Sequence, residues 1–280
     1  ALACPVCRSA FAEGAGGHSL VCRAGHSFDA AKQGYFNFLT GKGTVFEADS
    51  AAMVAARFDF LSAGHYRPLA EAVAELAAPS LAGDGATVLD SGTGTGHYLR
   101  ALLDRVPATA VGIDISKFAL RRAARLNPEA LNLVGDVWQP LPLADDAVDV
   151  VTVVFAPRNA AEFARVLRPG GRLIVVTPRP GHLAEIAGQT GMLGIEPAKE
   201  ERLAAALAGH FQAQEGQDLD LVLQLAPADV ANLALMGPAG HHLDPAALAA
   251  RVSGLPPRTA VSARFRISVF EPLQSAAPGR

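Results

Sequence analysis

A short apolar segment that runs into a loop with three glycines constrains the fold of this chain more than any other feature. The segment A-T-V-L-D-S-G-T-G-T-G-H-Y occupies residues 86–98, and leucines at helical spacing follow it. A strand, a glycine loop and a helix in this order form the first unit of a doubly wound nucleotide-binding sheet. Glycine allows the sharp turn and a close approach of the backbone to a ligand. The sequence therefore predicts a Rossmann-like α/β fold.

The spacing of the glycines distinguishes between two classes of cofactor. Dinucleotide-binding loops have the pattern G-x-G-x-x-G, whereas this loop has G-x-G-x-G and an acidic residue two positions before its first glycine. A carboxylate there attracts an amino-acid ammonium group and repels a pyrophosphate. S-adenosylmethionine carries an ammonium and a sulfonium but no phosphate, so we predict it as the cofactor. The contacts predicted from this segment are Asp90, Gly92, Gly94, Thr95, Gly96 and His97.

Two more acidic residues follow predicted strands. Asp114, in V-G-I-D-I-S, lies 18 residues after Gly96, and Ile115 comes next. An acid at this place accepts hydrogen bonds from ribose hydroxyls. Asp136 ends the segment L-N-L-V-G-D, where it can accept from an adenine amino group while Val137 packs against the ring. Both acids can instead be helix caps or solvated loop residues.

Further apolar runs extend the predicted sheet to seven strands. Residues 148–157 and 172–178 are continuous apolar runs separated by a helix over 159–168, whereas residues 218–225 and 259–270 alternate. The last run follows a helix and a Pro-Pro turn, so we expect it to lie antiparallel to its neighbour. The prediction is a parallel sheet with one reversed strand.

The substrate is expected at the carboxyl end of the fourth strand, because open α/β sheets bind ligands there. Phe155 can stack on a flat base or belong to the core, and Pro157 can hold the wall of the site rigid. Arg158 and Asn159 offer hydrogen-bonding groups for the edge of a base. His182 follows the fifth strand, where it can contact the methionine carboxylate or the substrate, or cap the next helix.

All cysteines of the chain lie near its beginning, in the pattern C-x2-C-x14-C-x3-H. A Cys3His set suits tetrahedral structural zinc, and metal binding stabilises a segment that is too short to fold unaided. His18 competes as the fourth ligand, but Gly25 allows a tight turn that favours His26. The predicted zinc ligands are Cys4, Cys7, Cys22 and His26.

The chain divides into a zinc-binding module over 1–40, a linker and helical entry segment over 41–80, and a catalytic domain over 81–280. Aromatic residues in 27–39 form either the core of the module or a surface that stacks on unpaired bases. Residues 49–78 are expected to form two helices with a break at 64–66. Residues 233–245 are a candidate lid.

The composition indicates where the protein is located and which partners it can bind. No apolar run reaches the ~18 residues of a membrane span, and no secretory h-region is present, so we expect a cytoplasmic protein with no membrane partner. The net charge of −3 does not indicate a nucleic-acid-binding protein, although 20 of the basic residues are arginine. Arginine allows an RNA partner, but GC-rich codon usage also explains this bias.

An ordered set of motifs resembles the 23S rRNA guanine-N1 methyltransferases, a family of housekeeping and macrolide-resistance enzymes. The motifs are C-P-V-C, C-R-A-G-H-S-F-D-A-A-K-Q-G-Y-F-N-F-L, M-V-A-A-R, L-S-A-G-H-Y-R-P-L, V-L-D-S-G-T-G-T-G-H-Y and V-F-A-P-R-N. The resemblance covers nearly the whole chain. Its most specific part is the zinc module joined to G-Y-F-N-F-L and G-H-Y-R-P-L. Phe38 replaces a leucine of the family pattern, which is a conservative change.

The resemblance implies a seven-stranded class I S-adenosylmethionine-dependent methyltransferase fold whose zinc module recognises RNA. It implies cofactor contacts from Tyr66, the Gly94–His97 loop and His182, zinc bound by the Cys3His set, and a homodimer. The implied reaction is methyl transfer to N1 of a guanine in a hairpin loop of 23S rRNA. The F-A-P-R-N segment resembles the resistance branch.

The expected mechanism is in-line displacement, in which guanine N1 attacks the sulfonium methyl. N1 carries a proton at neutral pH, and Asn159 and His182 are the candidates to receive it. Because the net charge is low, RNA contact requires a local cluster such as Arg121, Arg122 and Arg125, or the zinc module. A small-molecule methyltransferase with zinc as a brace and a non-catalytic RNA-binding protein are the alternatives.

Overall fold

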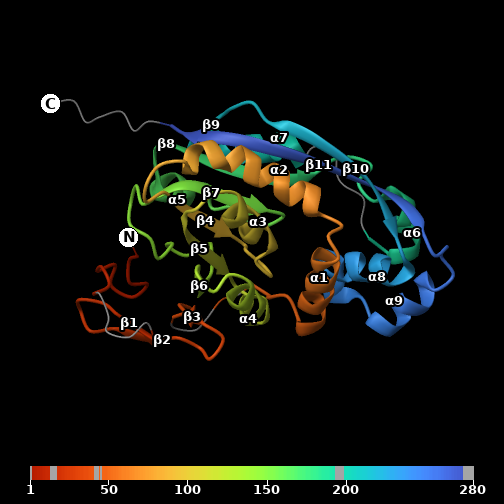
Figure 1. Cartoon of the computed structure of the whole chain (residues 1–280), viewed down its shortest axis with the longest axis horizontal. Coiled ribbons are helices and arrows are strands. Elements are labelled where there is room, and N and C mark those ends of the chain that lie inside the picture. Colours follow the sequence, from red (N-terminus) through yellow and green to blue (C-terminus); the bar gives the residue numbers. More distant parts are fainter. Residues whose placement is uncertain (1, 13–17, 41–43, 45, 193–198, 274–280) are drawn as a thin grey trace.

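One nine-stranded sheet forms the centre of the molecule (Figure 1). The computed structural model describes residues 2–12, 18–40, 44, 46–192 and 199–273. The strands follow the order β10-β11-β8-β7-β4-β5-β6-β3, and β9 pairs with β11. Their bounds are β3 Tyr35–Asn37, β4 Thr87–Ser91, β5 Thr109–Asp114, β6 Leu131–Val134, β7 Val148–Val154, β8 Leu167–Pro178, β9 Phe211–Ala213, β10 Gln217–Leu225 and β11 Thr259–Pro272.

The seven strands from β10 to β6 match the predicted sheet. Strands β8 to β6 are parallel, and β11 is antiparallel to both β8 and β10. The reversed strand is therefore the predicted one. The two additional strands, β3 and β9, were not predicted, because three residues are too few to establish a period-2 pattern.

Two helical layers cover the sheet. Leu69 of α2 and Leu99 of α3 share a core with Val150 of β7, whereas Phe163 of α5 packs with Val151 on the opposite face. Neighbouring residues of one strand thus enter different cores, as strand pleating requires. The helices are α1 Ala51–Ser62, α2 Arg67–Ala77, α3 His97–Arg105, α4 Lys117–Leu126, α5 Ala160–Val166, α6 Ala187–Thr190, α7 Lys199–Leu207, α8 Pro227–Leu235 and α9 Pro245–Val252, with short 3-10 turns η1 Ala78–Leu81, η2 Ala184–Ile186 and η3 Pro238–His242. None of the described helices is long and apolar enough to cross a membrane.

The two helices predicted within residues 49–78 are confirmed. The side chain of Ser50 caps α1 by accepting a hydrogen bond from Met53 N at 3.2 Å, a contact that typically contributes about 1 kcal/mol. Helix α1 ends at Ser62, and α2 begins at Arg67 with a proline in its first turn. The break at residues 64–66 therefore lies where the sequence predicted it.

The zinc module is attached to the edge of the main sheet. Strands β1 Ser19–Val21 and β2 Ser27–Asp29 form an antiparallel pair, and β3 pairs parallel with β6. The rings of Phe11, Phe28 and Phe38 lie 4.7–6.0 Å apart, and Phe38 is buried. Of the two interpretations of these aromatic residues, the structure therefore supports a core. The division of the chain at residues 40 and 80 stays a prediction.

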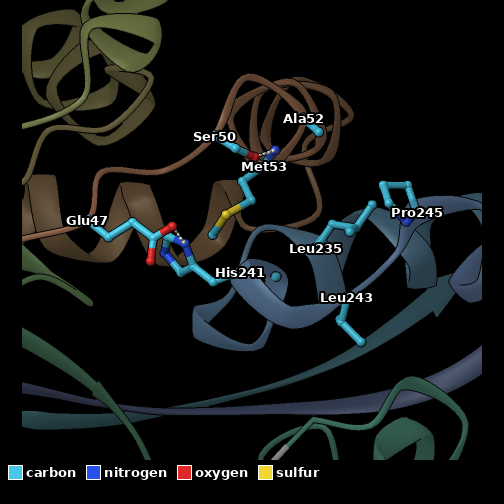
Figure 2. Close-up of a pocket in the computed structure, with 9 residues that line it drawn as sticks. Glu47, Ser50, Ala52, Met53, Leu235, His241, Leu243 and Pro245 are labelled. Atoms are coloured by element: carbon cyan, nitrogen blue, oxygen red, sulfur yellow. Dashed lines mark hydrogen bonds and ion pairs between the residues drawn. The ribbon is translucent and has the colours of Figure 1, made fainter.

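The candidate lid, residues 233–245, packs against the start of α1. A cavity of about 210 Å³ lies between them, and Glu47, Met53, Leu235 and His241 are among its lining residues (Figure 2). His241 lies 3.6 Å from Glu47 and 3.7 Å from Asp49. His241 thus lies beside two acidic residues of the entry segment.

Candidate active site and zinc centre

The four predicted zinc ligands lie together. Their ligand atoms are all within 4.8 Å of one another. The Sγ atoms of Cys7 and Cys22 are 3.7 Å apart, and His26 Nδ1 lies 3.4 Å from Cys22 Sγ and 3.8 Å from Cys4 Sγ. Ligands of tetrahedral zinc are separated by about 3.5–3.8 Å, given the usual Zn–S and Zn–N bond lengths. The donor set therefore fits zinc.

The local chemistry of the module favours a closed metal site. Hydrogen bonds from Ser9 lower the pKa of the Cys7 thiol to about 6, which favours the thiolate that binds metal. Gly25 adopts a φ of +86° in the turn between Cys22 and His26. His18 is exposed and lies outside the cluster. Because protein atoms supply all four ligands, zinc would have a structural role.

The glycine loop lies against the ends of three strands and one helix. Gly92 N and Thr93 N donate to Ile113 O at 2.8 and 3.0 Å. Gly92 has a φ of +74°, and a Cβ there would lie 2.2 Å from the Cβ of Ala156. Gly96, the N-cap residue of α3, has a φ of +84°. The loop is therefore fixed at the carboxyl edge of the sheet, where the cofactor was predicted.

Asp90 carries a buried carboxylate with one unsatisfied oxygen. Its Oδ1 accepts a hydrogen bond from Thr152 Oγ1 at 2.7 Å. Its Oδ2 and the hydroxyl of Thr93 have no hydrogen-bond partner among the described residues. Burial raises the pKa of Asp90. A buried carboxylate of this kind is stabilised by a cation, so the site fits the ammonium group of S-adenosylmethionine.

Asp114 orders the loop and the helix that follows β5. Its Oδ2 accepts from Gly94 N at 2.9 Å and its Oδ1 accepts from Ser116 N at 2.8 Å. These two hydrogen bonds agree with the alternative interpretation, in which Asp114 is an acidic residue that orders a loop. Each carboxylate oxygen has a second lone pair, so Asp114 can still accept a hydrogen bond from a ribose hydroxyl. Ile115, beside it, is half-buried.

Asp136 joins two segments at the end of β6. Its Oδ2 accepts from Thr44 Oγ1 at 2.8 Å, and its Oδ1 accepts from Trp138 N at 2.9 Å. Val137, the next residue, is half-buried. An adenine amino group at Asp136 would therefore have to share an oxygen with Thr44.

His97 supports the glycine loop with its side chain. Its Nδ1 lies 2.9 Å from Thr95 Oγ1, and its Nε2 lies 3.0 Å from Ser62 Oγ. Burial lowers the pKa of His97 to about 4. The ring is therefore neutral at physiological pH, and it links the loop to the end of α1.

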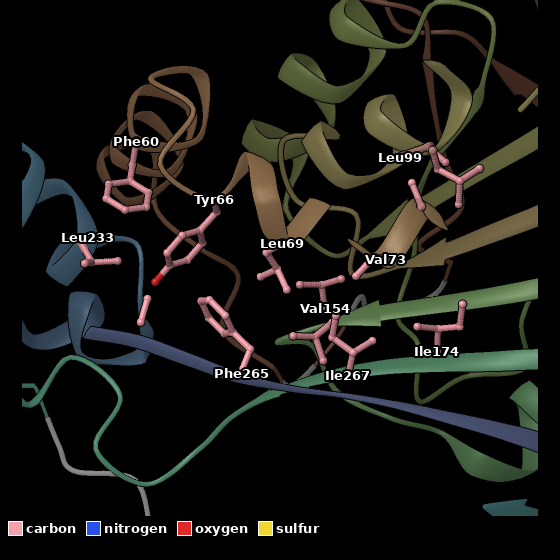
Figure 3. Packing of buried hydrophobic residues seen from close by; sticks show 14 of the residues in the cluster. Phe60, Tyr66, Leu69, Val73, Leu99, Val154, Ile174, Leu233, Phe265 and Ile267 are labelled. Atoms are coloured by element: carbon pink, nitrogen blue, oxygen red, sulfur yellow. The ribbon is translucent and has the colours of Figure 1, made fainter. Parts of the chain in front are cut away.

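A cluster of aromatic rings connects β11 with the end of β7, where the substrate is predicted to bind. The ring centroid of Phe265 lies 5.1 Å from that of Tyr66 (Figure 3). It lies 5.0 Å from the ring centroid of His182 and 5.7 Å from that of Phe155. The side chain of Phe155 is 45% exposed, and its φ of +55° is unusual for a bulky residue. The exposed ring agrees with base stacking rather than with the core. Phe265 was not predicted, because its strand alternation indicated only a buried position.

The two candidates for a proton acceptor are both engaged. His182 Nδ1 accepts a hydrogen bond from Arg264 N at 3.0 Å. The neutral ring therefore carries its proton on Nε2 and cannot accept another there. Asn159 caps α5 by accepting from Glu162 N at 3.4 Å, and it donates to Val137 O at 3.0 Å. Both side chains are thus suited to positioning.

Arg158 differs from these neighbours, because no ion pair or hydrogen bond joins it to a described residue. Burial lowers the pKa of this guanidinium. Pro157, beside it, is exposed. A half-buried cation without a carboxylate partner can bind an anionic or polar group of a substrate.

Arg57 lies beside the glycine loop, although no local sequence pattern marks it. It forms an ion pair with Asp49, and its Nη2 donates to Met236 O at 2.6 Å. Its Cδ would lie 3.6 Å from a Cβ on Gly94. The motif M-V-A-A-R contained this residue but did not reveal its position beside the glycine loop.

Two family models match separate parts of the chain. A model described as "RlmA, N-terminal", a zinc ribbon, matches residues 2–41. A model described as "Methyltransferase domain" matches residues 88–171. These matches confirm the predicted S-adenosylmethionine-dependent methyltransferase fold and the zinc ribbon.

Two relatives are similar over nearly their whole length. A putative 23S rRNA (guanine-N(1)-)-methyltransferase of Micromonospora griseorubida is 46% identical, over 97% of each chain. The 23S rRNA (guanine(748)-N(1))-methyltransferase of Streptomyces fradiae is 43% identical, again over 97% of each chain. The chain belongs to the 23S rRNA guanine-N1 methyltransferase family.

Solved structures show the fold of this methyltransferase in more distant proteins. YcgJ of Bacillus subtilis is 18% identical with a TM-score of 0.52, over 72% of this chain and 99% of its own. A putative methyltransferase of Bacillus halodurans is 16% identical with a TM-score of 0.51, over 71% and 97% of the two chains. At such identities the likeness extends to the fold alone.

Proposed function

We propose that this methyltransferase transfers the methyl group of S-adenosylmethionine to N1 of one guanine in 23S rRNA, the equivalent of guanine 748 named for the Streptomyces fradiae enzyme. The observation that carries the proposal is the match to that enzyme over 97% of both chains, because it includes the zinc ribbon as well as the glycine loop. A cofactor fold alone supports many methyl acceptors.

The cofactor site that we propose follows the carboxyl edge of the sheet. The unsatisfied Oδ2 of Asp90 receives the ammonium group, and Arg57, which lies beside Gly94, receives the carboxylate in place of its ion pair with Asp49. Asp114 accepts from the ribose, and Asp136 accepts from adenine. The remaining proposed contacts are Tyr66, Gly92, Gly94, Thr95, Gly96, His97, Ile115, Val137 and His182.

The chemistry of the reaction requires a guanine whose N1 has lost its proton. S-adenosylmethionine, when bound, supplies an electrophilic methyl group on its sulfonium. We propose that Phe155 stacks on the guanine, Pro157 limits its movement, and Arg158 donates to its O6. A cation at O6 stabilises the deprotonated base, because the negative charge spreads from N1 to O6. Asn159 and His182 position the guanine base, and the proton from N1 leaves to solvent.

Primer extension on 23S rRNA tests the proposed target. A methyl group at N1 blocks the pairing edge of guanine, so reverse transcriptase stops beside the modified base. We expect a new stop at the position equivalent to 748 after treatment with the wild-type enzyme, and none with the Asp114→Ala variant. If no stop appeared and the enzyme instead methylated a small molecule, the proposed rRNA substrate would be wrong and a small-molecule substrate would take its place.

Three finer statements belong to the same proposal. The enzyme acts as a homodimer, it works in the cytoplasm where its rRNA substrate is found, and it confers macrolide resistance, as the F-A-P-R-N segment indicates. Sedimentation analysis tests the first statement. Macrolide susceptibility of a sensitive strain with and without the gene tests the last: an unchanged inhibitory concentration despite a modified guanine would assign a housekeeping role.

A further inference from the structure

Helix α4 carries four basic residues and no acidic residue. Lys117, Arg121 and Arg125 are exposed, and Arg122 is half-buried. None of the four forms an ion pair with a described residue. The helix therefore presents uncompensated positive charge to solvent.

Most other arginines of the described chain are neutralised by carboxylates. The ion-paired arginines include Arg57, Arg100, Arg165, Arg168 and Arg179. An arginine in an ion pair has to give up its partner before it binds phosphate, whereas the cations of α4 do not. In a protein with a net charge of −3, α4 is consequently a surface where phosphates can bind with little competition.

An exposed aromatic residue lies among these cations. Phe118 is 45% exposed, and the guanidinium of Arg121 lies 5.4 Å from its ring centre. The guanidinium of Arg122 lies 4.6 Å from the ring of Phe58 on α1, which fixes this side chain. An aromatic face beside cations is the combination that binds unpaired bases and their phosphates.

The position of α4 links the zinc ribbon to the cofactor site. The helix begins three residues after Asp114, at the edge that carries the glycine loop, and in Figure 1 it lies between β3 and α1. Tyr35 of the ribbon is buried against Ala123 of α4. Lys32 is exposed two residues before Gly34, and a Cβ on Gly34 would lie 4.0 Å from the Cβ of Ala124. The exposed Lys32 of the ribbon is therefore two residues from a position that contacts α4.

We propose that the exposed face of α4, together with Lys32, binds the phosphodiester backbone of the rRNA hairpin, and that Phe118 stacks on one of its unpaired bases. The proposal rests on the proposed rRNA substrate. In this proposal the ribbon also has a structural role, because it holds α4 at the edge of the sheet. This role is separate from any contacts that the ribbon itself makes with RNA.

The test compares two double variants that each remove two exposed arginines without ion pairs among the described residues. Arg121→Ala/Arg125→Ala changes α4, and Arg251→Ala/Arg258→Ala is the matched control in and after α9. Affinity for a fluorescent hairpin of 23S rRNA is measured over a range of salt concentrations. Calorimetry with S-adenosylmethionine confirms that each variant is folded. If the α4 variant fails this check, Arg125→Ala alone replaces it.

We expect the α4 variant to bind RNA about tenfold more weakly at low salt, with a salt slope of log K that is smaller by about 1.5, because two phosphate contacts are lost. The control should match the wild type. Phe118→Ala should weaken binding about 5- to 100-fold without changing the slope. Equal behaviour of both double variants would overturn the proposal. A wild-type enzyme that neither binds nor methylates rRNA would instead refute the proposed function.

Discussion

The hydroxyl of Thr44 donates a hydrogen bond of 2.8 Å to the carboxylate of Asp136, across 92 residues of sequence. The entry segment is thereby attached to the strand end at which we propose that adenine binds. Thr44 occupies an oxygen that the proposed adenine contact would use, so we predict that cofactor binding and the position of the entry segment are coupled.

This coupling predicts opposite effects for two substitutions. Thr44→Val should strengthen S-adenosylmethionine binding by a few-fold, because it frees Asp136 Oδ2. Asp136→Ala should weaken binding by about tenfold, since a hydrogen bond to a charged group contributes about 1.5–3 kcal/mol. Calorimetric titration measures both. Weaker binding by Thr44→Val would instead show that the entry segment holds the cofactor in place.

The close contact between Gly92 and Ala156 predicts a large cost for a single methyl group. Gly92→Ala combines a positive φ with a Cβ 2.2 Å from Ala156, whereas Gly85 has a φ of +72° with nothing within 4 Å of its Cβ position. Gly85→Ala should therefore cost about 1–2 kcal/mol from backbone strain alone. Gly92→Ala should lower the free energy of unfolding by several kcal/mol and abolish cofactor binding. If urea unfolding gave equal losses of stability for Gly92→Ala and Gly85→Ala, the close contact between Gly92 and Ala156 would be contradicted.

The zinc centre predicts different results for two histidines. His26→Ala should lose the metal and release the ribbon from β6, because structural zinc contributes of order 10 kcal/mol to such modules. His18→Ala, which changes an exposed residue, should retain one zinc ion per chain. Metal analysis and RNA binding are the measurements. Zinc retained by His26→Ala and lost from His18→Ala would mean that the fourth ligand is the other histidine.

His97 predicts a dependence of stability on pH. Its folded pKa of about 4 lies below its ordinary value of 6.5. The unfolded chain therefore binds a proton first as the pH falls, so stability is fully present above pH 6.5 and is lost between 6.5 and 4. His97→Gln should show a shallower loss than the wild type over this window. If the free energy of unfolding of both proteins fell in parallel with pH, measured in zinc-saturated buffer, protonation of His97 would not contribute to the loss of stability.

Arg158 predicts a shift in the pH profile of the reaction. Without a cation at O6, guanine loses its N1 proton only at higher pH, so Arg158→Ala should reduce the rate at neutral pH by about 10²–10³. Its profile should move to higher pH, and Arg158→Lys should restore part of the activity. Asn159→Ala and His182→Gln should reduce the rate without moving the profile. If His182→Gln alone moved it, His182 would be the proton acceptor.

Elements with a strong local signal were predictable from the sequence. The strand that ends at Ser91, the glycine loop and the Cys3His set each combine residue type with spacing, and the structure brings together the four zinc ligands. The reversed strand was predictable because a helix and a Pro-Pro turn precede it.

Contacts between distant segments were not predictable. Arg57 lies beside Gly94, Thr44 contacts Asp136, and Phe265 lies beside His182 only because of the tertiary fold. Nothing in the local pattern marks these residues, since each is compatible with an ordinary helix, loop or strand. The backbone partners of Asn159 and His182, at Val137 and Arg264, likewise could not be predicted from the sequence.

The most direct test of the account measures the modified nucleoside itself. Purified 23S rRNA is incubated with the enzyme and methyl-labelled S-adenosylmethionine, digested to nucleosides and analysed by chromatography and mass spectrometry. We expect all of the label in 1-methylguanosine, approaching one per rRNA molecule. Label in any other nucleoside, or in no RNA at all while the enzyme binds the cofactor, would contradict methyl transfer to guanine N1.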